Sequence, residues 1–415
     1  MYNKKIFFAA FFILSTIQLS VSQNNTNSPY TRYGYGDITE STATELRGMG
    51  GVSLANRSKN TINSLNPASY SSVDSLTFMF DIGGGARYSR FSDKSTSSKT
   101  FNSNLEYITI RFPLAKWLGF SAGLQPYSFV GYNFSQSDSI SMPVAAGEDA
   151  KNIHYTQLFN GTGGFSQLYT GLSANLLNHV SIGVNAYYLF GDVSNYRNLI
   201  FSNTTDYTST VYNNNTHASD FRLRYGIQLY NTFNKKHNVT LGAIYENKTN
   251  LNGEFSATLN DTVLTSEKRF ELPQTFGVGL NYIYDNQLTL GVDYKTQAWK
   301  NALYMGKTDS LVNVSQFSLG AEYIPNPRGR KYTDRIRYRI GLNTSNPYYK
   351  LGTTKQPNNF VFSLGVGFPI HNEKSMINTS LEYGKIGSGS LLREDYLKLT
   401  FSASINEFWF MKRKL

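Results

Sequence analysis

The sequence predicts an all-β protein, a transmembrane antiparallel β-barrel of about 14 strands with an N-terminal luminal plug, or hatch. Aromatic residues make up 15% of the chain, and 34 Gly stand against 11 Pro, a balance that suits many strands joined by turns. Segments in which polar and apolar residues alternate recur from residue 76 to the end. The connections between them are alternately short and long, as in bacterial outer-membrane barrels.

The composition excludes several other classes of protein. Charged residues are only 16% and the mean hydropathy is −0.36, which excludes a bundle of membrane-spanning helices. The chain has no cysteine, so it forms no disulfide, thiolate metal site, cysteine nucleophile or lipidated N-terminal cysteine. The net charge of +11 would suit nucleic acid, but the low charge density and heavy aromatic content argue against that partner, and we expect none.

Residues 1–23 have the pattern of a signal peptide for export. Lys4 and Lys5 form a basic start, Ile6–Leu19 is mainly apolar, and Val21–Gln23 offers a small-residue exit. The apolar stretch is short for a spanning helix, although an N-terminal anchor is the alternative interpretation.

Residues 24–75 show no sustained alternation, and we expect them to form the hatch. Gly48, Gly50 and Gly51 permit positive φ angles or close backbone approach. Asn66 precedes a proline, a pair that starts turns. Because a barrel of about 14 strands is too wide for its own side chains to fill, this segment is the natural occupant of the lumen. The alternative is a disordered periplasmic arm.

Residues 76–415 are expected to form the barrel itself. In each alternating segment the polar phase is rich in Gly, Ser and Thr and includes charges, while the apolar phase often ends in Tyr. A lipid-facing exterior with an interfacial aromatic girdle requires this pattern. The apolar phase, including Leu290 and Leu399, should therefore point out toward lipid.

The lengths of the connections assign the two ends of the barrel. The short, periplasmic ones are Pro113–Lys116, Asn175–His179, Asn234–Asn238, Asp285–Gln287 and His371–Lys374, with Ile324–Arg335 as a longer turn on the same side. The long, external ones are Ser92–Thr100, Ser135–Gly164, Gly191–Ser219, Asn247–Glu271, Asn301–Val312, Asn346–Asn359 and Lys385–Leu392. Tyr196–Tyr212 is interpreted as part of an extended external hairpin, because bacterial barrels have an even number of strands.

The polar phase places a set of charges toward the lumen. These residues, which we expect to form a polar ladder, are Arg335, Arg337, Arg339, Glu322, Asp293, Arg222 and Arg224. Buried charges need partners, so they form salt bridges that join wall and hatch or bind the carboxylate of a ligand.

The segment Trp117–Ser135 carries Gly123 and Pro126 in its interior. Both residues disfavour continuous pairing within a sheet, so we expect a local break in the wall. The break is either a lateral gate for an apolar molecule or a bulge without a role in transport.

Catalysis finds little support in the sequence. The five histidines (His154, His179, His217, His237 and His371) all fall in predicted loops or turns. We find no spacing that suggests a metal site and no phosphate-binding glycine motif before a helix. The chain is expected to be no enzyme and to need no cofactor or metal.

Several motifs resemble the outer-membrane long-chain fatty-acid and hydrocarbon transporter family (FadL/TodX type), in its Bacteroidetes version. They are SPYTRYGYGD at Ser28–Asp37, the glycine cluster, NPAS at Asn66–Ser69, ELPQTFGVGLNY at Glu271–Tyr282 and NEFWFMKRKL at Asn406–Leu415. Asn66, Pro67 and Ala68 match the Asn-Pro-Ala motif that this family has in its hatch.

The resemblance implies a barrel in the outer membrane of a Gram-negative cell that passively takes up hydrophobic small molecules. These leave sideways through a kinked third strand, and the implied partners are outer-membrane lipid and the hydrophobic ligand. Barrels similar to this family also serve other outer-membrane proteins in Bacteroidetes, so the alternative is a non-transporting structural or secretion/assembly partner.

Overall fold

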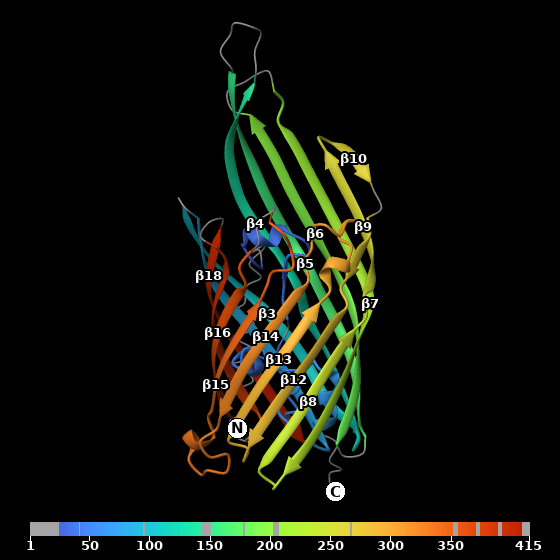
Figure 1. Ribbon diagram of the computed structural model, residues 1–415, viewed down its shortest axis with the longest axis vertical. Coiled ribbons are helices and arrows are strands. Elements are labelled where there is room, and N and C mark those ends of the chain that lie inside the picture. Colours follow the sequence, from blue (N-terminus) through green and yellow to red (C-terminus); the bar gives the residue numbers. More distant parts are fainter. Residues whose placement is uncertain are drawn as a thin grey trace, which may run out of the picture.

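The computed structural model of the protein forms a tall barrel with its strands inclined to the long axis (Figure 1). It describes residues 25–40, 42–93, 96–142, 151–176, 179–201, 207–265, 268–351, 356–370, 374–388 and 392–408. The expected signal peptide and the last seven residues, which include part of the C-terminal motif, lie outside these described residues.

Strands dominate the described chain, and the helices are short, with three to six residues each. The helical turns are η1 (Pro29–Arg32), α2 (Thr44–Arg47), η2 (Pro67–Ser72), η3 (Trp299–Asn301) and η4 (Tyr332–Arg335). The strands of the first half are β1 (Asp37–Ile38), β2 (Thr77–Ser92), β3 (Ser97–Ala115), β4 (Leu118–Met142), β5 (Lys151–Leu176), β6 (Val180–Phe201), β7 (Thr210–Phe233) and β8 (His237–Glu246). Those of the second half are β9 (Thr249–Leu259), β10 (Thr262–Thr265), β11 (Phe270–Leu272), β12 (Thr275–Tyr284), β13 (Leu288–Gln297), β14 (Val314–Tyr323), β15 (Arg337–Ser345), β16 (Asn359–Pro369), β17 (Met376–Gly387) and β18 (Arg393–Phe408).

The described strands close into an antiparallel barrel of 14 strands, which confirms the predicted fold class. The wall strands pair in chain order from β2 to β8 and from β12 to β18, β8 pairs with β12, and β18 returns to pair with β2 over its whole length. The strands β8 and β9 occupy one strand position in the wall, because they pair with successive parts of β7. No described helix is long and apolar enough to cross a membrane.

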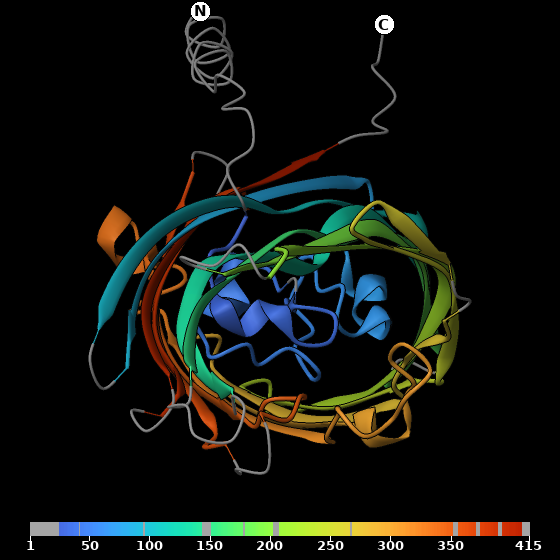
Figure 2. The same cartoon turned by 90° about the horizontal axis from the view of Figure 1, so that it is seen from above.

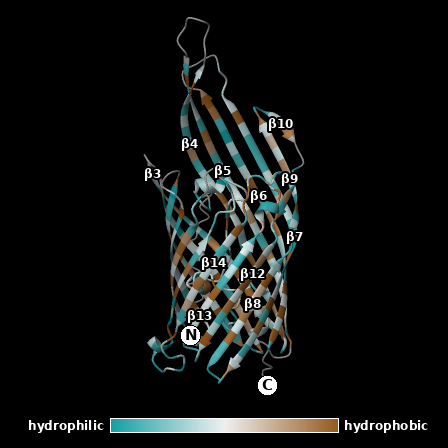
Figure 3. Ribbon diagram, viewed as in Figure 1, coloured by the Kyte–Doolittle hydropathy of each residue, from teal (hydrophilic) through white to brown (hydrophobic). Residues whose placement is uncertain are grey.

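The apolar phase faces outward, as expected. The side chains of Leu290 and Leu399 are 44% and 37% exposed on the barrel surface, whereas Asp293 is only 5% exposed. Colouring by hydropathy shows the alternation along each strand (Figure 3). The buried polar phase and the exposed apolar phase together fit a wall with lipid outside and a polar lumen.

Strands β4 to β7 continue far above the rest of the rim, where the sequence indicated long loops (Figure 1). Residues 135–142 extend β4 and residues 151–163 belong to β5, so the predicted external loop Ser135–Gly164 is mostly sheet. His154 and His217 therefore lie on β5 and β7, and the loop assignment of these two histidines was wrong. Polar residues on both faces hide the alternation that identifies a strand.

The segment that precedes β2 lies inside the ring of strands (Figure 2). We call residues 25–75 the luminal segment. Its turn η2 packs against β4 to β7, and its turn α2 packs against β16, β17 and β18, on another part of the wall. Close contact with both parts places the segment across the lumen.

Candidate functional site

The Asn-Pro-Ala motif of the luminal segment binds to the inside of the wall. Asn66 is fully buried, and its side-chain nitrogen donates to the carbonyl of Leu54 at 2.6 Å and to that of Ile227 on β7 at 3.3 Å. Its side-chain oxygen accepts from the backbone nitrogen of Ala68 at 3.1 Å. Asn66 thus joins two stretches of the luminal segment to the barrel, with Pro67 against glycines of the wall.

The carbonyl oxygen of Ala68 accepts hydrogen bonds from Ser173 Oγ at 2.9 Å and Ser181 Oγ at 2.6 Å, on β5 and β6. Ser71 lies beside the same pair, with 2.7 Å between its Oγ and that of Ser181. Small hydroxyl side chains on the wall therefore hold the backbone of η2 close.

The glycine cluster also makes close backbone contacts. Gly50 and Gly51 adopt φ angles of +69° and +80°, in the left-handed region that favours glycine. A side chain at Gly50 would lie 2.6 Å from the carbonyl oxygen of Leu342, and one at Gly48 would lie 2.9 Å from the Cα of Gly365. Gly48 and Gly50 let the backbone of the luminal segment lie directly on the wall.

The charges expected on β14 and β15 form a ladder that reaches the luminal segment. Arg339 Nε lies 2.6 Å from Glu322 Oε2, and Arg337 Nη1 lies 3.4 Å from Glu322 Oε1. Arg339 also lies 3.7 Å from Glu45 of α2. Burial raises the pKa of the Glu45 carboxyl, and the neighbouring Arg339 offsets part of that rise.

The other charges of the expected ladder lie elsewhere. Arg222 and Arg224 both pair with Glu246 of β8, the former at 2.6 Å. Asp293 does not join Glu322; its carboxylate accepts the backbone N–H groups of residues 53 and 54 at 2.6 and 2.8 Å. The expected set is thus three separate clusters, and each of them touches the luminal segment.

Arg335 is the exception among these residues. It lies in η4, within the periplasmic connection, and β15 begins only at Arg337. Its assignment to the luminal ladder was wrong, because the alternating phase was extended past the end of the strand.

Sequence reasoning missed a buried cluster around Glu106. This carboxylate is 1% exposed and lies 2.7 Å from both Arg47 of α2 and Lys398 of β18. Arg47 also lies 3.6 Å from Glu382. Glu106 is the extra residue of a bulge between β2 and β3. The polar–apolar alternation is interrupted at a bulge, so it does not predict whether the side chain of the extra residue points inward or outward.

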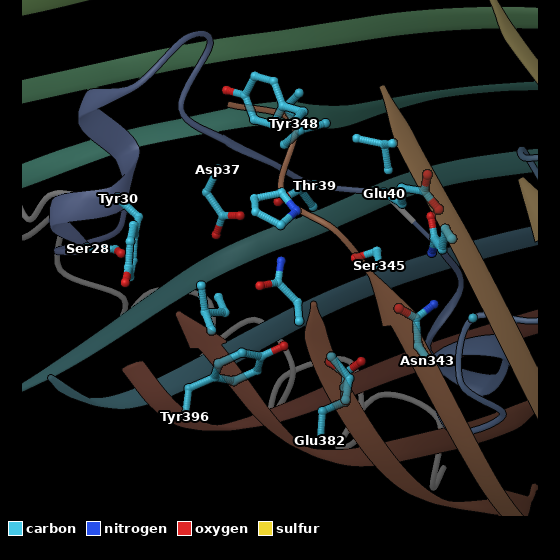
Figure 4. A pocket seen from close by; sticks show the side chains of 18 of the residues that line it. Ser28, Tyr30, Asp37, Thr39, Glu40, Asn343, Ser345, Tyr348, Glu382 and Tyr396 are labelled. Carbon is cyan, nitrogen blue, oxygen red and sulfur yellow. The ribbon is translucent and has the colours of Figure 1, made fainter. Parts of the chain in front are cut away.

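A cavity of about 280 Å³ lies between the luminal segment and the wall (Figure 4). Its lining carries many polar and charged groups, which include Asp37, Glu40, Glu382, Asn343 and Ser345. Such a lining suits water or a polar solute and does not suit a hydrocarbon. Among the described residues no group of three or more acidic or histidine side chains is placed to hold a metal ion.

The apolar part of the lumen is filled by the protein's own rings. We call Tyr35, Phe165, Trp299, Tyr304 and Tyr348 the aromatic cluster. The ring centroid of Tyr35 lies 5.6 Å from that of Trp299, which lies 4.9 Å from that of Tyr348. Tyr35 Oη donates to the carbonyl of residue 271 at 2.9 Å, and burial raises the pKa of this phenol. The cluster joins the luminal segment to loops of the second half of the chain.

The wall is interrupted between β3 and β4. Their pairing runs from Leu118 to Leu124 and stops there, whereas β4 continues on β5 to Met142. The pairing of β4 with β5 has a bulge between Pro126 and Ser128. Gly123 remains paired on both sides, so the break begins just above it. We call the open stretch between β3 and β4 the seam.

Residues of the luminal segment line the seam from inside. Asp37 and Ile38 of β1 pair with Phe129 and Ser128 of β4. Thr39 donates its backbone N–H to the carbonyl of residue 127 at 2.9 Å. Thr31 Oγ1 exchanges hydrogen bonds with the backbone N–H and carbonyl of residue 131. We call residues 31–39 the strap, since they take the place that β3 leaves.

Comparison with known proteins identifies the type of barrel to which this fold belongs. The sequence family described as BamG matches residues 1–415, and no curated protein sequence is detectably similar. The crystal structure of the toluene transporter TbuX of Ralstonia pickettii superposes with a TM-score of 0.57 and 13% identity, over 87% of this chain and 97% of that one. A FadL homologue of Pseudomonas aeruginosa gives 0.58 and 12%, over 91% and 100%. The toluene transporter TodX of Pseudomonas putida gives 0.54 and 14%, over 91% and 99%.

At these identities the similarity concerns the fold, which is that of the FadL type. Two of these structures are described as toluene transporters.

Proposed function

The chain belongs to the BamG family, and we propose that this member is an outer-membrane channel for passive uptake of hydrophobic small molecules of the fatty-acid or hydrocarbon class. The ligand enters from the external side, displaces rings of the aromatic cluster and leaves sideways into the membrane through the seam. Residues 24–75 act as the hatch, with Asn66, Pro67 and Ala68 as its fixed end and the strap as its moving end.

The observation that carries this proposal is the end of β3–β4 pairing at Leu124. The inner face of β4 beside the seam bears Tyr127 and Val130, which pack in the same apolar cluster as Tyr35. An apolar ligand that replaced these contacts would have a route to lipid without crossing a polar layer. Transfer of apolar surface out of water supplies roughly 25 cal/mol per Å², so no energy coupling is required.

A lock on the strap tests the proposal. Ile38 and Ser128 face each other in an antiparallel pair, and the chain has no cysteine of its own. The paired substitutions Ile38→Cys and Ser128→Cys would form a disulfide that fixes the strap to β4. We expect uptake of a radiolabelled fatty acid or of toluene into whole cells to stop on oxidation and return on reduction.

The matched control is a disulfide between Ser194→Cys and Asn215→Cys, which face each other in the continuous β6–β7 ladder. This control should leave uptake unchanged in both redox states. Equal uptake by the locked and the reduced strap variants would contradict a lateral route.

A second function is favoured by the packing of the lumen. Buried ion pairs fix the luminal segment, and the described cavity beside it is polar. These features suit a non-transporting barrel that acts as a structural or secretion/assembly partner of other outer-membrane proteins. Gentle extraction from the native membrane distinguishes the two: a bound acyl chain supports transport, and a protein partner at fixed stoichiometry without any uptake activity supports the second function.

A further inference from the structure

The tall strands of the barrel form a sheet that rises above the rest of the rim (Figure 1). Above the rim this sheet runs in the order β4, β5, β6, β7, β9 and β10. At one edge β10 has only four residues, and short edge strands resist unwanted pairing. At the other edge, the residues of β4 from Gln125 to the end of that strand do not pair with β3. The two edges therefore differ in how open they are to another strand.

The hydrogen bonds of the strap show which groups of β4 point outward at this edge. Gly131 directs both its N–H and its carbonyl to Thr31, away from β5. The direction of the backbone groups alternates along a strand, and β4 has no further bulge above Ser128. The N–H and carbonyl groups of Asn133, Ser135 and Ser137 therefore also point away from β5. In the described part of the chain no other strand pairs with β4 on that side above Phe129.

This edge lacks the usual protection against pairing. Natural edge strands carry lysine, proline or bulges that keep other strands away. Residues 132–137 contain no proline, no charge and no bulge. Protection begins only at Asp138, whose carboxylate accepts the N–H of Ser139 at 2.8 Å. At about 3.3 Å per residue, the open stretch of 132–137 would hold a strand of roughly six residues.

A second copy of this chain does not fit the edge. Copies in one membrane have the same orientation, so two adjacent β4 strands would run in the same direction with the same residues facing each other. In a parallel ladder, the residues whose N–H and carbonyl groups face the partner must be offset by one position between the two strands. A two-fold axis along the membrane normal places the same residues at the same height, so it does not allow this offset. We therefore take the partner strand to come from a different polypeptide.

We propose that the outer edge of β4 at Asn133–Ser137 binds an extended segment of another cell-surface protein, which joins the sheet as an added strand. Main-chain hydrogen bonds hold the segment, and its alternating side chains select it. On the inner face it meets Tyr132 and Phe134, and on the outer face it meets Asn133 and Ser135. The preferred segment is apolar on one face and polar on the other. This interaction does not depend on whether the barrel transports a ligand.

Residue-resolved hydrogen exchange of the full chain tests the proposal without any mutation. The amides of Asn133, Ser135 and Ser137 should exchange about tenfold or more slowly in native outer membranes than in the purified protein. The amides of Phe134 and Gln136 point to β5 and serve as internal references that stay protected in both. Rapid exchange of the outward amides in both samples would overturn the proposal. Slow exchange in both samples would also overturn it, because the chain itself would then cover the edge.

A pair of variants gives a second, independent test. Ser135→Pro removes one outward N–H, and proline is tolerated on the open side of an edge strand. Ser135→Thr keeps that N–H and serves as the matched control. In native membranes the proline variant should lose the slow exchange at Ser137 while the threonine variant retains it. Retention of slow exchange in both variants would count against an added strand.

Discussion

Replacing Glu106 with glutamine should release part of the luminal segment from the wall. The carboxylate is 1% exposed and is the near partner of both Arg47 and Lys398, each at 2.7 Å. Its loss leaves two buried cations, of which Arg47 retains Glu382 at 3.6 Å as an acidic partner and the carbonyl of Glu40 at 3.2 Å. Breaking a buried pair in this way costs about 3 kcal/mol or more. Local opening around α2 should therefore increase by roughly a hundredfold, since about 1.4 kcal/mol corresponds to a factor of ten.

The assay is hydrogen exchange at the amides of Leu46 and Gly51, which are bonded within and just after α2. The control is Asp74→Asn, which breaks a pair with Lys59, whose two side chains are 37% and 67% exposed, and a longer contact with Lys374 at 3.5 Å. An exposed pair contributes at most about 1 kcal/mol, so exchange should rise about fivefold or less. Adding Lys398→Met to Glu106→Gln should restore part of the protection. The reasoning is refuted if Glu106→Gln changes exchange no more than the control does.

Asn66→Ala should detach η2 from the wall at a cost of about 2 kcal/mol, because buried backbone groups lose their partner, and cleavage of the luminal segment by added protease should become faster while the barrel stays intact. Gly341→Ala would place a methyl group 2.0 Å from a backbone nitrogen of the luminal segment and push that segment off the wall, so single-channel conductance in planar bilayers should rise. In the control Gly84→Ala the nearest atom lies 3.7 Å from the added methyl group, so the conductance should not change. Leu290→Arg should lower the stability of the folded barrel in lipid bilayers by roughly 2–4 kcal/mol in denaturant titrations, because Leu290 faces lipid, and Val263→Arg on the external sheet should have little effect.

The phase of the wall strands was predictable from the sequence because lipid and lumen impose opposite chemistry on alternate residues. Leu290 and Leu399 therefore lie outside and Asp293 lies inside, as expected. The height of the external sheet was not predictable. Above the membrane both faces of β4 to β7 meet polar surroundings, so segments such as Asn213–Thr216 lack the alternation that marks a strand.

The candidate site was predictable only in part. Arg337, Arg339 and Glu322 could be paired from their phase, because they sit on regular neighbouring strands. Glu106 and Tyr127 could not be placed, since each is the extra residue of a bulge and a bulge reverses the phase beyond it. One of the two near partners of Glu106, Arg47, comes from the luminal segment, which has no period from which a register could be read.

The position of the luminal segment has a consequence for how the protein is made. The segment is covalently attached to β2, yet it contacts β5 to β7 at one end and β16 to β18 at the other. Once β18 has joined β2, a folded stretch with buried arginines has no way through the wall. We infer that the growing sheet wraps around its own leading peptide, whose contacts with β5 to β7 hold it in place until the last two strands meet.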